Sequence, residues 1–315
     1  MILVTGGCGF IGSEVVRQLV AAGRRVRVVD NLSKPSSKVP AGVEFQEADL
    51  ADPAAARRAF EGVRSCINLA ARIGGIGYFH RLPATILSEN AKIYSNTFEA
   101  AVAAKIERML FISSSMVYES ATHFPSREQD VHEIPPPFTA YGFSKLMGEW
   151  YCRAFADQFG LRWTVIRPFN AYGPGEEAGE QVGESHVIPD LIKKVLDGQD
   201  PLELLGDGRQ TRCYTHVRDI ARGIVLAHDS ASAVDQEFNL SVPRETTVLE
   251  LARMIFDLCG TGRSFRTTSV EGFPSDVKRR IPDTKKAHDL LGWQAEISLE
   301  DGLRVLVDAA RAARS

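Results

Sequence analysis

Residues 2–12 read ILVTGGCGFIG, an apolar run that ends in a cluster of glycines. Within it, residues 7–12 form the pattern G-x-G-x-x-G, which follows a predicted strand at 2–5 and opens a predicted helix at 11–22. Glycine suits this turn because the backbone must approach a pyrophosphate closely and the helix must begin near the strand. In this strand–turn–helix context the cluster predicts a dinucleotide-binding site.

Beyond this stretch, short β-branched runs alternate with longer helical patterns, an order typical of a parallel sheet covered by helices. The predicted strands lie at 2–5, 25–30, 43–46, 65–69, 109–113 and 161–167. The predicted helices lie at 11–22, 52–60, 84–104 and 140–158. Right-handed crossovers would wind this order into an α/β fold with a Rossmann-type doubly wound parallel sheet.

The second half of the chain is less regular, with a helix predicted at 187–197 and a strand at 202–205. We therefore assign residues 1–168 to a dinucleotide-binding domain and residues 169–315 to a smaller C-terminal substrate-binding lobe. A run at 237–241, EFNLS, is again typical of a strand and could return to the main sheet. The two units are therefore expected to be interleaved.

The composition is that of an ordinary globular protein, with 44% hydrophobic and 24% charged residues. The formal net charge of -3 gives no field that would collect nucleic acid or anionic lipid. The first residues show neither a basic leader nor a long apolar core after it, so we expect no membrane span and a cytoplasmic location. The cysteines stand singly at Cys8, Cys66, Cys152, Cys213 and Cys259. This spacing fits neither a disulfide framework nor a zinc site, so no metal is expected.

A carboxylate at the end of the second predicted strand bears on the choice of cofactor. Asp30 lies about twenty residues beyond the glycine cluster, where it can accept hydrogen bonds from the adenosine ribose diol. A 2′-phosphate would meet a negative charge there, so NAD is favoured over NADP. The alternative is a simple turn that Asp30 forms with Asn31. Three nearby arginines could then hold a phosphate: Arg24, Arg25 and Arg27.

Tyr141 and Lys145 are four residues apart at the start of a predicted helix and share its apolar face. An ammonium beside a phenol lowers the pKa of the phenol by stabilising the phenolate, and a cationic nicotinamide would lower it further. The pair is thus a candidate general base near neutral pH. Ser113–Ser115 ends a predicted buried strand, where one hydroxyl could bridge substrate and tyrosine. The alternatives are a surface tyrosine with a solvated lysine, and a strand end that caps itself.

Further motifs accompany these residues over nearly the whole chain. They are Thr5–Gly12, Asp49-Leu50, Asn68–Ala71, Ser114–Tyr118, Tyr141–Lys145, Arg167–Pro174, Gly206–Arg212 and Leu291–Trp293. In these motifs the chain resembles the extended short-chain dehydrogenase/reductases, specifically the NAD-dependent nucleotide-sugar epimerases and dehydratases. Members of that family commonly pair through the helices that correspond to 84–104 and 140–158, so the resemblance implies a homodimer.

The resemblance also implies roles for individual residues. Ser114 would be the catalytic serine, Tyr141 the base and Lys145 the residue that binds the nicotinamide ribose. Asn90 would be the usual structural asparagine. Besides Tyr141 and Lys145, the implied contacts to NAD are Gly6, Gly9, Phe10, Ile11, Gly12, Asp30, Asn31, Asp49, Leu50, Leu69, Ala70 and Ala71. The implied contacts to a nucleotide-diphosphate sugar are Ser115, Asn170, His186, Val187, Arg212 and Arg280.

The guanidinium groups of Arg209, Arg212 and Arg280 stand in sequence where the family binds phosphates, and their forked donors suit phosphate oxygens. The alternative interpretation is a solvated charged face, and it is strongest for Arg280, which belongs to the run Lys278–Arg280.

The two positions after the catalytic serine bear on the reaction. By the resemblance, dehydratases and decarboxylases place an acid at the position of Ser115 or Met116, while 3,5-epimerases and fucose-type enzymes place a cysteine at Met116. Methionine can supply neither proton-transfer group. The remaining chemistry is oxidation at C4, turning of the 4-keto sugar and return of the hydride to its other face. We therefore predict a UDP-glucose/galactose 4-epimerase-like enzyme that regenerates its NAD every cycle.

Other functions remain open. Ala71–Ile76 and Ser185–Pro189 resemble segments of the GDP-sugar 3,5-epimerases and fucose synthases, in which a histidine at the His186 position resembles the general acid. If His186 reaches the pocket, epimerisation at C3 or C5 becomes the leading idea; otherwise His186 caps a helix or faces solvent. A 4-keto-sugar reductase would consume NADPH, against which Asp30 counts. A regulator that binds NAD without turnover would not need a tuned phenol such as Tyr141.

Overall fold

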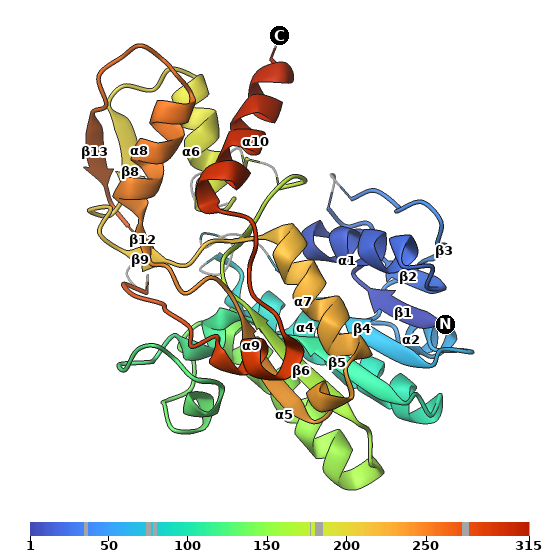
Figure 1. Cartoon of the computed structure of the whole chain (residues 1–315). Helices are drawn as coiled ribbons and strands as arrows, with labels where there is room; N and C mark the ends of the chain where they lie inside the picture. Colours follow the sequence, from blue (N-terminus) through green and yellow to red (C-terminus); the bar gives the residue numbers. More distant parts are fainter. Residues whose placement is uncertain are drawn as a thin grey trace.

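The chain forms a seven-stranded parallel sheet in the computed structural model, which describes residues 1–34, 37–73, 77, 81–176, 178–179, 185–272 and 277–314. The strands stand in the order β11-β6-β5-β4-β1-β2-β3 (Figure 1). Their bounds are β1 (Ile2–Thr5), β2 (Val26–Asp30), β3 (Glu44–Glu47), β4 (Ser65–Asn68), β5 (Arg108–Ile112), β6 (Trp163–Pro168) and β11 (Gln236–Leu240). The predicted Rossmann-type α/β fold is confirmed.

Helices cover both faces of the sheet. They include α1 (Phe10–Ala21), α2 (Pro53–Ala59), α4 (Pro83–Ala103), α5 (Ala140–Phe159) and α7 (Val217–Asp229). Successive side chains of a strand point to opposite faces, so a buried parallel strand needs apolar residues at every position. Val4 and Val28 accordingly belong to a core with the apolar sides of α1 and α7. Leu3 and Val29 belong to a second core with α2, α4 and α5.

The direction of sheet growth reverses at β1. The chain adds β2 and β3 on one side of β1, and then β4, β5, β6 and β11 on the other. The loops that follow β1 and β4 therefore run in opposite directions and leave a crevice at the carboxyl ends of the strands. Gly6 follows β1 and Leu69 follows β4, so both residues lie at this crevice.

The sequence predicted the bounds of the elements in the first half accurately. Each predicted strand and helix is present, and its ends shift by at most two residues. The strand predicted at 109–113 ends at Ile112, so Ser113–Ser115 lie just beyond it. The strand near 237–241 is β11, which pairs with β6 from Gln236–Thr164 to Leu240–Pro168.

A second group of elements has a hydrophobic core of its own. It comprises α6 (Val187–Leu196), β8 (Leu202–Leu205), α8 (Val248–Leu258), β13 (Thr267–Val270) and α10 (Leu299–Ala312). Figure 1 shows these elements gathered beyond the carboxyl ends of the large sheet. We propose that they form the smaller lobe of the chain, with α7 and β11 returned to the larger one.

Shorter elements complete the fold. They are β7 (Ala171–Tyr172), β9 (Thr211–Arg212), β10 (Thr215–His216), β12 (Thr246–Thr247), α9 (Lys285–Leu291) and the 3-10 turns η1 (Ser115–Tyr118), η2 (Glu128–His132) and η3 (Ala231–Ala233). Among the helices of the described residues, none has the length and apolarity needed to cross a bilayer. The described residues also contain no cluster of His, Cys, Asp and Glu that could hold a metal ion.

Candidate active site

A cavity of about 1140 Å³ lies at the crevice and extends to the smaller lobe. Small-molecule pockets typically measure 300–1,000 Å³, so this cavity has room for a dinucleotide and a second ligand together. With the exception of Arg209, the residues that the sequence proposed for catalysis, NAD and the nucleotide sugar line its wall. Arg209 is not part of this wall, and its side chain is 87% exposed.

The glycine turn brings backbone to one side of the cavity. Gly6 has φ +66°, and a Cβ there would lie 2.9 Å from the backbone nitrogen of Ala70. A Cβ on Gly12 would lie 2.2 Å from the carbonyl oxygen of Gly6. Helix α1 begins at Phe10 with Gly9 as its N-cap, no capping side chain and no acidic residue in its first turn. The positive N-terminus of the helix is therefore available to bind an anion. Together with the close glycine backbone it forms a cradle that fits the pyrophosphate of NAD.

Asp30 faces the cavity and also stabilises the turn. Its Oδ2 accepts a hydrogen bond from the backbone N–H of Cys8 (3.0 Å), and its Oδ1 accepts one from Leu32 (2.9 Å). Each carboxylate oxygen can accept a second hydrogen bond, so the ribose diol still finds acceptors. Arg24 and Arg27 do not compete for a phosphate here, because they pair with Asp229 and Glu44 away from the cavity wall.

The Tyr141–Lys145 pair is buried at the bottom of the cavity. Both residues are 4% exposed, so a surface tyrosine with a solvated lysine is excluded. The Nζ of Lys145 donates to the carbonyl oxygen of Ile112 (2.8 Å) and lies 5.9 Å from the ring centre of Tyr141. Helix α5 begins one residue before Tyr141, and Thr139 caps it by accepting the N–H of Gly142 (3.0 Å). Ser114 lines the same wall.

Burial controls the protonation of the pair. It raises the pKa of Tyr141, and a hydrogen bond with Ser114 and the charge of Arg280 act against the rise. Burial lowers the pKa of Lys145 to about 7, against the opposing charge of Glu149. The phenol is therefore neutral at pH 7 in the protein alone. The charge that stabilises the phenolate includes Arg280, which sequence reasoning did not connect with Tyr141.

The two arginines take different positions. Arg280 is 6% exposed, so the alternative of a solvated charged face is wrong for it. Its Nη1 donates to the hydroxyl oxygen of Ser115 (3.1 Å), which places the guanidinium next to the candidate catalytic serine, Ser114. The Nη1 of Arg212 donates to the carbonyl oxygens of Thr211 (2.8 Å) and Val277 (2.6 Å), so the backbone orients that guanidinium at the cavity wall.

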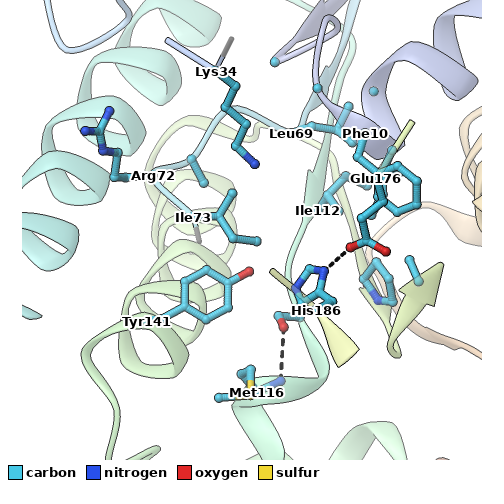
Figure 2. Close-up of a pocket in the computed structure, with 18 of the residues that line it drawn as sticks. Phe10, Lys34, Leu69, Arg72, Ile73, Ile112, Met116, Tyr141, Glu176 and His186 are labelled. Atoms are coloured by element: carbon cyan, nitrogen blue, oxygen red, sulfur yellow. Dashed lines mark hydrogen bonds and ion pairs between the residues drawn. The ribbon is translucent and has the colours of Figure 1, made fainter. Parts of the chain in front are cut away.

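His186 reaches the cavity, and its ring is hydrogen-bonded to the carboxylate of Glu176 (Figure 2). It stands at the N-cap position of α6, but its side chain does not cap the helix. The side chain is 55% exposed and lines the cavity. Burial among cavity atoms lowers the pKa of His186, but the charge and hydrogen bond of Glu176 outweigh this and raise it.

Other wall residues were not proposed as site residues from the sequence. Figure 2 shows Ile73 and Met116 flanking Tyr141, with the ammonium of Lys34 extending into the cavity. Burial lowers the pKa of Lys34, while the charges of Glu176 and Asp30 oppose this. Residues 74–76 of the proposed segment 71–76, and residues 177 and 180–184 ahead of the proposed segment 185–189, lie outside the described residues.

Asn90 connects the cavity wall to α5. Its Oδ1 accepts the N–H of Arg72 (2.6 Å), and its Nδ2 donates to the carbonyl oxygen of Arg72 (3.3 Å) and to the hydroxyl oxygen of Ser144 (3.0 Å). The asparagine therefore holds the segment after β4 against the helix that carries the Tyr–Lys pair.

A dinucleotide cradle that shares one cavity with a buried phenol and ammonium defines an enzyme with a nicotinamide cofactor. The family model described as NAD dependent epimerase/dehydratase family matches residues 2–241. A putative UDP-glucose 4-epimerase of Methanocaldococcus jannaschii is 32% identical over 98% of this chain and 97% of its own length. UDP-glucuronic acid decarboxylase 1 of Xenopus tropicalis is 30% identical over 96% of this chain and 70% of its own.

Solved structures agree with these relatives. The crystal structure of a UDP-glucose 4-epimerase of Thermotoga maritima with UDP-glucose has a TM-score of 0.89 and 32% identity, over 100% of this chain and 99% of that one. A Thermus thermophilus UDP-glucose 4-epimerase complex with NAD has a TM-score of 0.86 and 28% identity, over 99% of both chains. The chain belongs to the NAD-dependent epimerase/dehydratase family. The predicted family and the predicted cofactor, NAD, are confirmed.

Proposed function

We propose that the protein epimerises a nucleotide-diphosphate sugar at C4 through a transient 4-keto sugar. The main support is the wall next to Ser114, where Ser115 is held by Arg280 and Met116 has no ionisable group. Elimination or decarboxylation needs a second proton-transfer group near the sugar, and these two positions supply none. The relatives described as UDP-glucose 4-epimerases support the same reaction.

Each residue at the site has its own role in the proposed reaction. Tyr141, as phenolate, accepts the proton of the C4 hydroxyl, and Ser114 hydrogen-bonds the same oxygen. Lys145, when protonated, places a positive charge beside the phenolate and favours its formation. The first residues of α1 would hold the pyrophosphate of NAD, and Asp30 would hold its adenosine ribose. When bound there, NAD would supply a reversible acceptor for the C4 hydride.

Proton NMR tests the proposal. The NAD-loaded protein is incubated in turn with UDP, GDP, dTDP and CDP hexoses, and the anomeric signals are followed. We expect one nucleotide sugar to yield an equilibrium mixture of two C4 epimers without consumption of added NAD, because the hydride returns in every cycle. Stoichiometric reduction or oxidation of added cofactor, or loss of carbon dioxide or water from the sugar, would contradict C4 epimerisation.

The position of His186 favours a second candidate, epimerisation at C3 or C5. The Glu176–His186 pair faces the same cavity as Tyr141, so it could move a proton at a carbon next to the keto group. The same NMR experiment in D2O separates the candidates. Epimerisation at C4 alone returns the original hydrogen and leaves C3 and C5 unlabelled, whereas the second candidate places deuterium at one of these carbons.

We further propose a homodimer built on α4 and α5. Aromatic side chains are exposed along α5, with Phe143 at 43%, Trp150 at 60% and Phe159 at 50% exposure. Phe143 and Trp150 are seven residues apart and therefore share one face of α5, and apolar exposure of this kind marks interaction surfaces. Light scattering is expected to give twice the 34.6 kDa of one chain, and Trp150→Glu is expected to give a monomer. A wild-type protein that remains at 34.6 kDa would rule out the dimer.

A further inference from the structure

The 3-10 turn η1 links the positions of the two proposed catalytic hydroxyls. Ser114 lies at its start, and the helix that carries Tyr141 packs against it. Ser114 caps the start of η1, because its Oγ accepts the N–H of Met116 (3.2 Å). Glu119 follows the last residue of the same turn and is 6% exposed. The position of Ser114 and the position of the Glu119 carboxylate are thus set by one short, buried piece of backbone.

The carboxylate of Glu119 holds the beginning of α5. Its Oε2 accepts the backbone N–H of Thr139 (2.9 Å), and its Oε1 accepts the hydroxyl of Thr139 (2.6 Å). Thr139 is the N-cap of α5 and accepts the N–H of Gly142 through the same hydroxyl oxygen (3.0 Å). Tyr141 is the second residue of this helix, so the carboxylate fixes the helix end from which the phenol projects.

Close packing surrounds this clasp. A Cβ on Gly142 would lie 2.8 Å from the carbonyl oxygen of Met116 and 3.1 Å from the Cδ of Glu119. The first turn of α5 therefore rests directly on η1 and on the Glu119 side chain. A loss of the carboxylate cannot be repaired by a small shift of the helix toward η1, because the backbones already touch.

Arg280 adds an electrostatic link. Its guanidinium donates to Ser115, the first residue of η1, and its charge acts on both Glu119 and Tyr141. Burial raises the pKa of Glu119, while the hydrogen bonds from Thr139 and the charge of Arg280 lower it. Lys145 on its own helix and Tyr94 on α4 are further ionisable groups near Tyr141, and the Glu176–His186 pair faces it across the cavity.

We propose that Glu119 is a positioning residue for the proposed base: its carboxylate clasps the start of α5 to the turn that carries Ser114, and its charge offsets that of Arg280 beside the phenol. This inference rests on the proposed role of Tyr141. It goes beyond that role, because Glu119 does not line the cavity and acts on the reaction only through Tyr141 and Ser114.

Two variants separate the clasp from the charge. Glu119→Ala removes both, and we expect kcat to fall by roughly 10²-fold with a small change in KM, since a misplacement near 1 Å costs about that much. Glu119→Gln keeps an acceptor for Thr139 and is expected to recover most of this kcat. Thermal unfolding checks that each variant is folded, and the NAD content checks that it still binds the cofactor.

The pH profile reports on the charge. Without the negative charge of Glu119, the positive charge of Arg280 stabilises the phenolate more strongly and lowers the pKa of Tyr141. In Glu119→Gln the acid limb of kcat/KM is therefore expected to move to lower pH, on the order of one unit for charges interacting across several ångström of protein. A purely structural role of Glu119 would lower activity without moving this limb.

Matched controls make the outcome decisive. Glu133 is exposed, and Glu133→Gln is expected to leave kcat and the pH profile unchanged. If Glu119→Ala fails to fold, Thr139→Ala and Thr139→Ser decide, because only serine keeps the hydroxyl that binds Glu119. Equal kcat in these two, or wild-type kcat and pH profile in folded Glu119 variants, would overturn the inference. Tyr141→Phe is measured alongside, and its full activity would instead overturn the proposed function.

Discussion

Tyr141→Phe is expected to lower kcat by roughly 10²–10⁴-fold, the usual contribution of a general base, while the protein keeps its fold and its bound NAD. The phenol is 4% exposed and lies at the bottom of the cavity, so phenylalanine fills the same space without exposing new surface. Steady-state kinetics with the substrate found by NMR measure the effect, and the NAD content of the purified variant shows that the cradle is intact.

Tyr151→Phe serves as the matched control for this variant. Tyr151 lies on the same helix and packs against the core through its ring, away from the cavity wall. Removing its hydroxyl is expected to leave kcat within a few-fold of the wild-type value. Turnover that survives in Tyr141→Phe would eliminate the phenol as the base and would leave proton transfer to the Glu176–His186 pair.

Glu149→Gln is expected to lower the free energy of unfolding by about 3–5 kcal/mol, the cost of breaking a buried ion pair. Glu149 on α5 and Arg167 on β6 are both 0% exposed and are joined by two parallel hydrogen bonds of 2.8 and 2.7 Å. Glu149 also accepts the hydroxyl of Ser113 (2.6 Å). The variant leaves the Arg167 charge buried without its carboxylate, and urea unfolding measures the loss.

The double variant Glu149→Met with Arg167→Met is the control for charge burial. Replacing both members of a buried pair by apolar residues of similar volume is often neutral or stabilising. We therefore expect the double variant to unfold at a higher urea concentration than Glu149→Gln. If the single and double variants unfold at the same urea concentration, the lost stability comes from the polar network around Tyr118 and Glu128 rather than from the unpaired charge.

Local sequence patterns were sufficient for the elements of the first half. The strands at 2–5 and 65–68 are short β-branched or apolar runs, and the helices between them carry an apolar face, so each element shows in its own residues. Helix α7 at 217–229 was not predicted, although Ile220, Ile224 and Ala227 follow helical spacing and are buried against α1. The signal was present, but the surrounding irregular segments obscured it.

The residues of the site also fall into two groups, those that a local motif predicts and those that meet only in the folded chain. Contiguous motifs placed the glycine turn, Tyr141 and Lys145 on the cavity wall, because their spacing is set within one turn or one helix. The contact between Arg280 and Ser115 joins residues 165 positions apart, and the clasp between Glu119 and Thr139 depends on how η1 meets α5. No local pattern encodes such meetings, which follow from packing between elements.

The position of β11 also sets the order in which the molecule can be completed during synthesis. Until residues 236–240 leave the ribosome, the outer edge of β6 presents unpaired N–H and C=O groups, and such edges recruit other strands. Helix α7, which covers α1, precedes β11 by only a few residues and so emerges almost as late. The growing chain must therefore carry this open edge while residues 169–240 are synthesised, and chaperones can bind it during that interval.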